Sequence, residues 1–348
     1  MRLEDIAEKA GVSRSTVSRV INNDPNVSEK TRSRVWSIIN REGYIPNPMA
    51  RAMVTRRTNV IGIVVPQSIN VFFGNNSYYP QLLQGMSEMI AARDNAMLLM
   101  LQNDSETREQ FAHRITRNRL VDGMILCSIQ LDDPIVNQVL EMGHVTVSVE
   151  RPADSVKDRI SYVSIDNLSA SKLMVQHLIE GGYRRIGHVT GHLNIADGRD
   201  RLAGYRLALE EAGLPVDPDF IAEGNFSHEY GYEAMKTLLP RHLDAVFAAG
   251  DTTAQGVIEA INEAGMRVPD DIAVVGFDDL DVALQTVPPL TTMRHPIQEK
   301  GMRAVSLLLD LIDKVVENPQ QILLPTQLVI RESCGTQKDT LHSMKEGI

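Results

Sequence analysis

The chain has 348 residues, of which 43% are apolar and 23% charged, and its formal net charge is −10. This length suggests two domains of ordinary size with room for a small third, and the apolar fraction excludes wholesale disorder. The sequence has no run of eighteen apolar residues, which excludes a membrane span, and its charged start lacks the apolar core of a secretory signal. Its two cysteines, Cys127 and Cys334, lie far apart, which excludes a disulfide framework and a Cys-type zinc site and fits a reducing, cytoplasmic compartment.

Charge is distributed unevenly along the chain. Residues 1–57 hold 11 lysines and arginines against 6 acidic residues, a net charge of +5, whereas the remainder carries −15. A basic head on an acidic body suits a protein whose N-terminal end meets a polyanion such as nucleic acid. A chance fluctuation in a short window is the alternative.

Residues 1–45 have the pattern of three short amphipathic helices. The first covers 3–10 and ends at Gly11, since a helix C-cap favours a positive φ that glycine adopts without strain. Ser13 caps a second helix over 14–21, and a third runs from Ser28 to about Glu42. Two helices joined by a tight glycine turn, with converging apolar faces, are typical of a helix-turn-helix domain.

The second helix presents hydrogen-bonding groups and arginines on the side away from the predicted core. Such side chains read base edges in the major groove of duplex DNA. The alternative is a generic three-helix bundle with a solvated face. The residues on this side are Arg14, Ser15, Thr16, Ser18, Arg19 and Asn22.

The sequence of residues 46–58 indicates a hinge between the head and the rest of the chain. Two prolines break the third helix, and residues 48–54 can form a helix of about two turns, which is unstable alone in water. Arg51 would hold that helix against phosphates if it folded on DNA. An exposed Met53 suits a wedge pushed between base pairs in a minor groove. An ordinary linker whose methionine docks on the body is the alternative.

Residues 59–332 alternate short apolar runs with amphipathic helices, the rhythm of βαβ units with parallel sheets. Two series of about four units indicate two similar lobes. The first series of strands is 60–65, 97–101, 124–127 and 145–149, and the second is 162–165, 186–190, 245–248 and 272–277. Helices are expected near 80–93, 106–119, 134–142, 168–181, 199–213, 228–239 and 252–265. The body is predicted to end with a helix over 296–317, whose segment 304–316 belongs to the core, and a strand over 322–330. Residues 333–348 are predicted to form a disordered tail.

The head carries a recognisable sequence. LEDIAEKAGVSRSTVSRVINNDPNVSEKTRSRVWSIINREGYIPNPMARAM resembles the N-terminus of the lactose-repressor (LacI/GalR) family of transcription regulators, and its V-S-x-x-T-V-S-R-V-I-N core is highly specific. The resemblance implies a wedge at the central step of a palindromic operator, with Met53 where the family usually has leucine. It also implies base reading by Arg14, Ser15 and Arg19, and phosphate contacts by Ser13, Thr16 and Asn22.

The body is similar to the same family through segments such as DRLAGYRLALEEAGL, AVFAAGDTTAQGVIEAINEAGMRVPDDIAVVGFDD and PPLTTMRHP. The resemblance implies a two-lobed, periplasmic-binding-protein-like α/β body with three crossing strands and an effector cleft. With the all-α head, this defines the expected fold class. The tail lacks leucine heptads, so a homodimer is expected rather than a tetramer held by a coiled coil.

Candidate effector residues follow the carboxyl ends of the predicted strands, where ligands of open α/β sheets bind. Arginines and carboxylates bond sugar hydroxyls, and an aromatic face covers the CH side of a sugar. For Asp251 and Asp279, a helix cap or a salt bridge is as reasonable as a ligand contact. By resemblance, Arg201 and Asp278 match ligand contacts, Phe226 matches an aromatic wall, and Glu150, Gly250 and His295 fall at other pocket positions. Phe73 is a second candidate aromatic face.

The effector is expected to be a mono- or oligosaccharide. The aromatic stretch PQSINVFFGNNSYYPQLLQGM and the segment LDDPIVNQVL are similar to regulators that respond to maltose and other α-glucosides. Gly250 stands where lactose-type members carry asparagine, and Ile195 where purine-type members carry arginine. A purine- or nucleoside-responsive repressor of the same family is the alternative.

The expected function is a repressor that binds an inverted-repeat operator as a dimer and whose DNA affinity a small molecule controls. G-x-S-x-G, Walker A, dinucleotide-fingerprint and H-E-x-x-H motifs are all absent, and no cofactor or metal is expected. The acidic residues at strand ends keep a sugar-processing enzyme open on chemical grounds, but the head makes it improbable. A sugar-binding transport receptor is a further alternative, but it would require export.

Overall fold

The structure is a computed structural model that describes residues 2–45, 55, 57–65, 77–317 and 319–335. The predicted hinge helix with Arg51 and Met53, the aromatic residue Phe73 and the tail beyond residue 335 lie outside the described residues.

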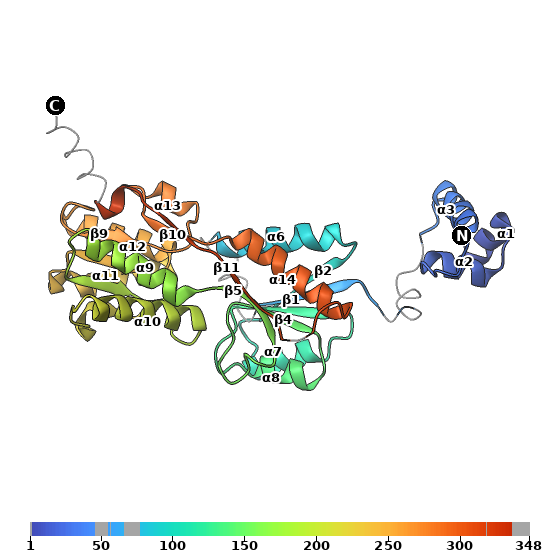
Figure 1. The fold of residues 1–348 in the computed structure, drawn as a ribbon, viewed down its shortest axis with the longest axis horizontal. Coiled ribbons are helices and arrows are strands. Elements are labelled where there is room, and N and C mark those ends of the chain that lie inside the picture. The colour runs from blue at the N-terminus through green and yellow to red at the C-terminus, as the bar shows by residue number, and fades with distance from the viewer. Residues whose placement is uncertain (1, 46–54, 56, 66–76, 318, 336–348) are drawn as a thin grey trace, which may run out of the picture.

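The head consists of three helices around one small core (Figure 1). These are α1 (Leu3–Ala10), α2 (Arg14–Ile21) and α3 (Glu29–Glu42). The turn after α1 has Gly11 at φ 61°, and the hydroxyl of Ser13 caps α2 by accepting a hydrogen bond from the Thr16 amide at 3.1 Å. The helices pack through fully buried side chains that include Ile6, Val17, Val20 and Val35. This confirms the predicted helix-turn-helix fold.

Lobe 1 is built on a parallel six-stranded sheet in the order β11-β5-β4-β3-β1-β2. Side chains alternate between its faces: Ile61 and Ile63 join the core under α6 and α14, while Val64 joins the core under α7 and α8 (Figure 1). The strands are β1 (Val60–Val65), β2 (Ala96–Leu101), β3 (Gly123–Cys127), β4 (Thr146–Val149), β5 (Ser161–Ile165) and β11 (Gln321–Leu324). The helices are α6 (Tyr78–Ala92), α7 (Arg108–Thr116), α8 (Pro134–Glu141) and α14 (Ile297–Ile312).

Lobe 2 is built on a parallel four-stranded sheet in the order β7-β6-β8-β9. The helix pairs α9–α10 and α11–α12 cover it, and a short antiparallel pair, β10 with β12, bridges to the end of β9. The strands are β6 (Ile186–Val189), β7 (Ile221–Ala222), β8 (Ala245–Ala248), β9 (Ala273–Val275), β10 (Thr292–Arg294) and β12 (Gln327–Val329). The helices are α9 (Asn167–Glu180), α10 (Ala196–Glu211), α11 (His228–Leu238), α12 (Asp251–Glu263) and α13 (Val282–Gln285), with 3-10 turns η1 (Pro218–Phe220), η2 (Leu239–Arg241) and η3 (Glu332–Cys334).

The chain crosses between the lobes three times: after β5, between β10 and α14, and between β11 and β12. Two predictions were wrong here. The strand predicted to open the second series, 162–165, belongs to lobe 1 because β5 pairs with β4 and β11. The predicted strand 322–330 is two strands, because Pro325 and Thr326 lie at a crossing and the two halves pair in different lobes.

The folded body extends past residue 332, where the tail was predicted to begin. The Ser333 side chain accepts a hydrogen bond from the Thr291 amide at 2.8 Å and donates one to the Val274 carbonyl at 2.6 Å. Cys334 is fully buried in the main core. The predicted core helix 304–316 is confirmed over 304–312 within α14, whose Ala304, Val305 and Leu308 are buried, but residues 313–316 form turns and bends rather than helix.

Two kinds of feature are absent from the described residues. No described helix is both long enough and apolar enough to cross a membrane. No described set of three or more His, Cys, Asp or Glu side chains is arranged to hold a metal ion.

Candidate DNA-binding surface and effector site

The outward side of α2 is exposed as its sequence predicts. Arg14, Ser15 and Arg19 are exposed, while Thr16, Ser18 and Asn22 are half-buried. The two arginines retain 72% and 64% side-chain exposure, although they form ion pairs with Glu4 at 3.2 Å and Asp24 at 3.9 Å. Exposed pairs of this kind contribute little to stability, so the guanidinium groups can exchange their partners for bases or phosphates. The hydroxyl of Ser13 is engaged as the helix cap.

The chain that enters the body after the hinge segment is fixed by one carboxylate. Asp122, at the start of β3, accepts hydrogen bonds from Arg57 Nε at 3.2 Å, from the Thr58 amide and hydroxyl at 2.7 and 2.8 Å, and from the Asn59 amide at 2.8 Å. Arg57 also bonds Asp313 at 2.6 Å, directly after the last residue of α14. The first residues after the hinge are therefore tied both to the sheet of lobe 1 and to the end of its longest helix.

The lobe 2 half of the candidate effector site is organised by Arg201, which is 3% exposed on α10. Its Nε donates to Asn167 Oδ1 at 2.9 Å, and its Nη2 lies 3.2 Å from Asp278 Oδ1 and 3.9 Å from Asp197 Oδ2. Asn167 in turn donates to Asp197 at 2.9 Å. The buried cation therefore has two carboxylate partners, as burial of a charge requires.

Asp278 and His295 of the predicted set meet beside this arginine. His295 Nε2 lies 3.4 Å from Asp278 Oδ1, but neither ring nitrogen has a hydrogen-bond partner among the described residues, and neither does Asp278 Oδ1. Burial raises the pKa of Asp278 to about 6, against the opposing effect of Arg201, and burial lowers the pKa of His295 well below its ordinary value. Buried polar atoms without partners are uncommon in folded proteins, which marks this as a place where a polar ligand fits.

The lobe 1 half is a buried triad of Tyr78, Glu150 and Lys300. Tyr78 donates to Glu150 Oε1 at 2.5 Å, and Lys300 Nζ donates to the Tyr78 hydroxyl at 2.8 Å and lies 3.5 Å from Glu150 Oε1. The other oxygen of Glu150 accepts the Ser128 amide at 2.9 Å. Burial raises the pKa of Glu150, while Lys300 acts to lower it.

The lobe 1 and lobe 2 halves of the site contact each other through one aromatic ring from each lobe. Tyr78 stacks on His295 at 5.9 Å between ring centroids, with an interplanar angle of 14°. We refer to Tyr78, Glu150, Arg201, Asp278, His295 and Lys300 as the interlobe cluster. Tyr78 belongs to the aromatic stretch that the sequence associates with a sugar effector, but it was not predicted as a site residue. Lys300 was missed; its only signal in the sequence is a charged residue within the apolar face of a predicted helix.

Aromatic side chains line the lobe 2 half. Phe226 is half-buried at φ 68°, with its ring 5.6 Å from the Arg201 guanidinium. Gly191 makes room for that ring, because a Cβ there would lie 1.9 Å from it. Phe277, which was not predicted as a site residue, lies closer, at 3.7 Å from the guanidinium. A Cβ on Gly250 would lie 3.5 Å from both Phe226 and Asp278, so a side chain at 250 would enter this space.

Asp251 and Asp279 both have hydrogen-bond partners within lobe 2, which favours the structural alternative for these two residues. Asp251 is fully buried and accepts hydrogen bonds from the Leu280 amide at 2.8 Å and the Thr292 hydroxyl at 2.6 Å. Asp279 accepts hydrogen bonds from Arg294 at 2.6 Å and Arg331 at 2.5 Å. Both carboxylates hold the loops that follow β9, which positions Asp278 between them.

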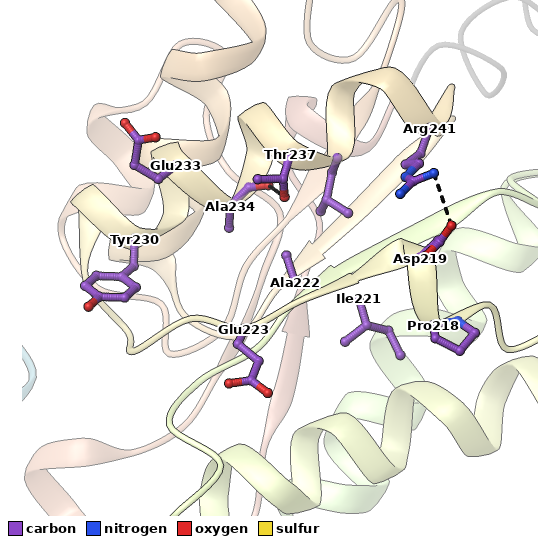
Figure 2. Close-up of a pocket in the computed structure, with 11 residues that line it drawn as sticks. Pro218, Asp219, Ile221, Ala222, Glu223, Tyr230, Glu233, Ala234, Thr237 and Arg241 are labelled. Atoms are coloured by element: carbon purple, nitrogen blue, oxygen red, sulfur yellow. Dashed lines mark hydrogen bonds and ion pairs between the residues drawn. The ribbon is translucent and has the colours of Figure 1, made fainter.

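A groove of about 460 Å³ lies elsewhere, at the edge of lobe 2 where β7 and η1 pass α11 (Figure 2). Asp219 and Arg241 form an ion pair across one end at 3.1 Å, and Tyr230, Glu223 and Glu233 project at the other. None of its lining residues belongs to the interlobe cluster. The groove is therefore distinct from the candidate effector site.

Comparisons with known proteins agree with this architecture. Residues 2–47 match the model of the bacterial regulatory proteins of the lacI family, and residues 175–334 match a periplasmic binding protein-like domain. The HTH-type transcriptional regulator CelR of Thermobifida fusca is 37% identical over 333 residues, covering 95% of this chain and 97% of CelR. The chain belongs to the lacI family. As a lacI-family member it is a DNA-binding transcriptional regulator with a helix-turn-helix head and a two-lobed body.

Other lacI-family proteins match over almost the whole chain. The HTH-type transcriptional repressor PurR of Escherichia coli is 32% identical, covering 95% of this chain and 96% of PurR. The structure of the CelR–cellobiose complex superposes with a TM-score of 0.76 at 35% identity, covering 96% of this chain and 99% of that one. The lac repressor dimer bound to operator and the anti-inducer ONPF gives a TM-score of 0.80 at 27% identity, with the same coverage.

Proposed function

We propose that this lacI-family regulator represses transcription by binding an inverted-repeat operator as a homodimer, and that a neutral glycan bound at the interlobe cluster controls its affinity for DNA. The observation that carries the proposal is the cluster itself, in which Arg201 and Lys300 already have carboxylate partners while both ring nitrogens of His295 lack a hydrogen bond and Asp278 Oδ1 has only ion-pair contacts. A nearby relative has been described in complex with cellobiose, a neutral disaccharide, which supports this class of effector.

The charge balance of the cluster favours a neutral ligand. Arg201 is paired with Asp278 and Asp197, and Lys300 with Glu150, so neither cation is available for a phosphate or a carboxylate without breaking a buried pair. The sequence of residues 66–76, which lie outside the described residues, contains no charged residue and therefore no further cation for an anionic ligand. Hydroxyl groups, by contrast, both donate and accept hydrogen bonds, which suits Asp278 Oδ1 and the ring nitrogens of His295. Among neutral glycans we favour a β-linked glucoside over the α-glucoside suggested by the sequence, on the strength of the CelR relative.

The DNA side of the proposal rests on α2. We propose that Arg14, Ser15 and Arg19 read base edges and that Thr16 and Asn22 contact phosphates; the exposure of the first three and the partial exposure of the other two support this. Two heads of a symmetric dimer would meet two half-sites related by a two-fold axis, which requires an inverted repeat. Met53 as a minor-groove wedge remains part of the proposal, carried by the sequence alone.

A single helix connects the effector site to the base of the hinge. Near its first turn α14 contributes Lys300 to the interlobe cluster, and directly after its last turn Asp313 bonds Arg57. At 1.5 Å per residue, the segment between them spans about 20 Å. A shift of α14 caused by ligand at one end therefore moves Arg57, and with it the start of the hinge, at the other. Coupling of about 1–3 kcal/mol would change operator affinity about 5- to 150-fold.

The test uses the full chain. Selection from random DNA should enrich an inverted repeat, and cellobiose should then change the affinity for that repeat in fluorescence anisotropy. Maltose, glucose 6-phosphate and hypoxanthine serve as comparison ligands, for the α-glucoside, anionic and purine alternatives. Enrichment of no repeat would refute the operator proposal, and a response to the phosphate or the purine alone would refute the neutral-glycan proposal.

A further inference from the structure

Two residues that no function has yet been given form an ion pair between the lobes. Arg151 directly follows Glu150 at the end of β4 in lobe 1, and Asp200 directly precedes Arg201 on α10 in lobe 2. Arg151 donates from Nε to Asp200 Oδ2 at 3.0 Å and from Nη2 to Asp200 Oδ1 at 2.7 Å. The pair is bidentate, the geometry in which arginine and carboxylate interact most strongly.

The position of this pair relative to the interlobe cluster is informative. In each lobe, the residue next in sequence to a cluster member contacts the other lobe. Glu150 and Arg151 lie just past the end of β4 and have different partners: Glu150 bonds Tyr78, Ser128 and Lys300 within lobe 1, whereas Arg151 bonds Asp200 of lobe 2. Side chains at 200 and 201 also leave α10 in different directions, about 100° apart. The ion pair is therefore made beside the cluster and leaves the cluster free for a ligand.

The pair is also shielded better than an ordinary surface ion pair. The side chains of Arg151 and Asp200 are 27% and 22% exposed, whereas Asp154, the other carboxylate near Arg151, is 76% exposed. A second contact across the lobes accompanies it, from the Leu131 amide to the Asn194 carbonyl at 2.8 Å. Glu150 and Arg201 are the sequence neighbours of the two paired residues. The ion pair between Arg151 and Asp200 therefore limits how far Glu150 and Arg201 can move apart.

We infer that Arg151 and Asp200 are positioning residues for effector binding: their ion pair holds the lobes at the separation at which Glu150 and Arg201 face the same ligand. This inference rests on the proposed function for the identity of the ligand, but the arrangement of the lobes is testable without one. Loss of the pair lets the lobes separate, so the ligand must supply the closing free energy and binds more weakly.

The first experiment measures the distance between the lobes in the full, ligand-free chain. Spin labels at E141C on α8 and K236C on α11 report on lobes 1 and 2 respectively; both positions are exposed, whereas Cys127 and Cys334 are buried. With the labelled chain diluted into an excess of unlabelled chain, so that a dimer carries at most one labelled copy, electron–electron double resonance should give one narrow distance distribution, which R151A or D200A broadens and shifts. The charge-exchanged variant R151E/D200R should recover the narrow distribution, and D154A, which removes only the exposed partner, should leave it unchanged. An unaltered distribution in R151A and D200A would overturn the inference.

The second experiment measures cellobiose binding by calorimetry in the same variants. R151A and D200A should bind about tenfold more weakly, in line with the loss of a charged hydrogen-bonded pair, and R151E/D200R should recover affinity. Operator affinity without cellobiose should show that the head and dimer are intact. Unchanged cellobiose affinity in both single variants would refute the positioning role. If the wild-type chain binds no cellobiose, the proposed effector is wrong, and the distance measurement still decides the inference.

Discussion

The two halves of the interlobe cluster differ in how completely their polar groups are satisfied. In lobe 1, both oxygens of Glu150 accept hydrogen bonds and Lys300 is paired with Tyr78 and Glu150. In lobe 2, Asp278 Oδ1 and the ring nitrogens of His295 have no hydrogen-bond partner among the described residues. Lobe 2 therefore offers the hydrogen-bonding capacity that a ligand would use. In lobe 1, the hydrogen bonds and ion pair already form a closed network.

The largest loss of cellobiose affinity is expected from a substitution in lobe 2. Arg201→Ala removes the cation from Asp278 and Asp197, and breaking a buried pair in this way costs about 3–5 kcal/mol. We expect cellobiose affinity to fall at least about 100-fold in calorimetry and the unfolding temperature to drop. Arg206→Ala, an exposed change on the same helix, is the control. Retained binding in Arg201→Ala would show that lobe 2 is not the main ligand half.

The lobe 1 triad provides a double-mutant cycle. Lys300→Met leaves Glu150 buried without its cation, and we expect a loss of about 3 kcal/mol in stability with weaker coupling between glycan and operator. The double variant K300M/E150Q should regain most of the stability, because it removes both buried charges. Denaturant unfolding measures the first quantity and anisotropy with cellobiose the second. Arg303→Met, exposed on the same helix, is the control; additive effects of the two substitutions would contradict the closed network.

Asp278 should make a distinct contribution to the pH dependence of stability. In the unfolded chain this carboxyl ionises near 3.8, and in the folded protein its pKa is raised to about 6, mainly by burial. The folded state thus binds the extra proton between these values, so this group's contribution to stability falls as pH rises from 4 to 6, by up to about 1.4 kcal/mol per pH unit. Arg201, Lys300 and Asp197 face the same group.

Glycan affinity should follow the opposite trend. The ionised Oδ1 accepts a ligand hydroxyl, so cellobiose affinity should rise with pH through about 6, by up to about tenfold per unit. Calorimetry at pH 5 and pH 7 measures this change, and Asp278→Asn should remove most of it. A pH profile that persists in Asp278→Asn would assign the titration to another group.

The smallest loss of cellobiose affinity is expected from a substitution of Tyr78, whose ring stacks on His295 between the two halves of the interlobe cluster. Tyr78→Phe keeps the stack on His295 but removes the hydroxyl between Lys300 and Glu150, at a cost of about 1 kcal/mol. Cellobiose affinity should fall only a few-fold, with Tyr230→Phe, on the exposed face of α11, as the control. A loss as large as that of Arg201→Ala would show that lobe 1 binds the ligand as strongly as lobe 2.

Local patterns in the sequence determined the elements and the head. Apolar spacing located α1, α2 and α3, and the alternation of apolar runs with amphipathic helices located nearly all strands of both sheets, because each pattern reports which face of one element is buried. The strand ends pointed to Glu150, Arg201 and Asp278, since parallel strands place their carboxyl ends at one edge of the sheet, whereas His295 was predicted from the resemblance to the family.

Only the tertiary structure decided which lobe each crossing strand joins and which residues of the candidate site contact one another. The strand at 161–165 looks like its neighbours in sequence, and its place in lobe 1 depends on pairing with β11, more than 150 residues away. The roles of Lys300, of the Arg151–Asp200 pair and of the structural Asp251 likewise depend on partners distant in the chain. A hydrogen bond or ion pair requires a distance of a few ångströms, and no local pattern carries that distance.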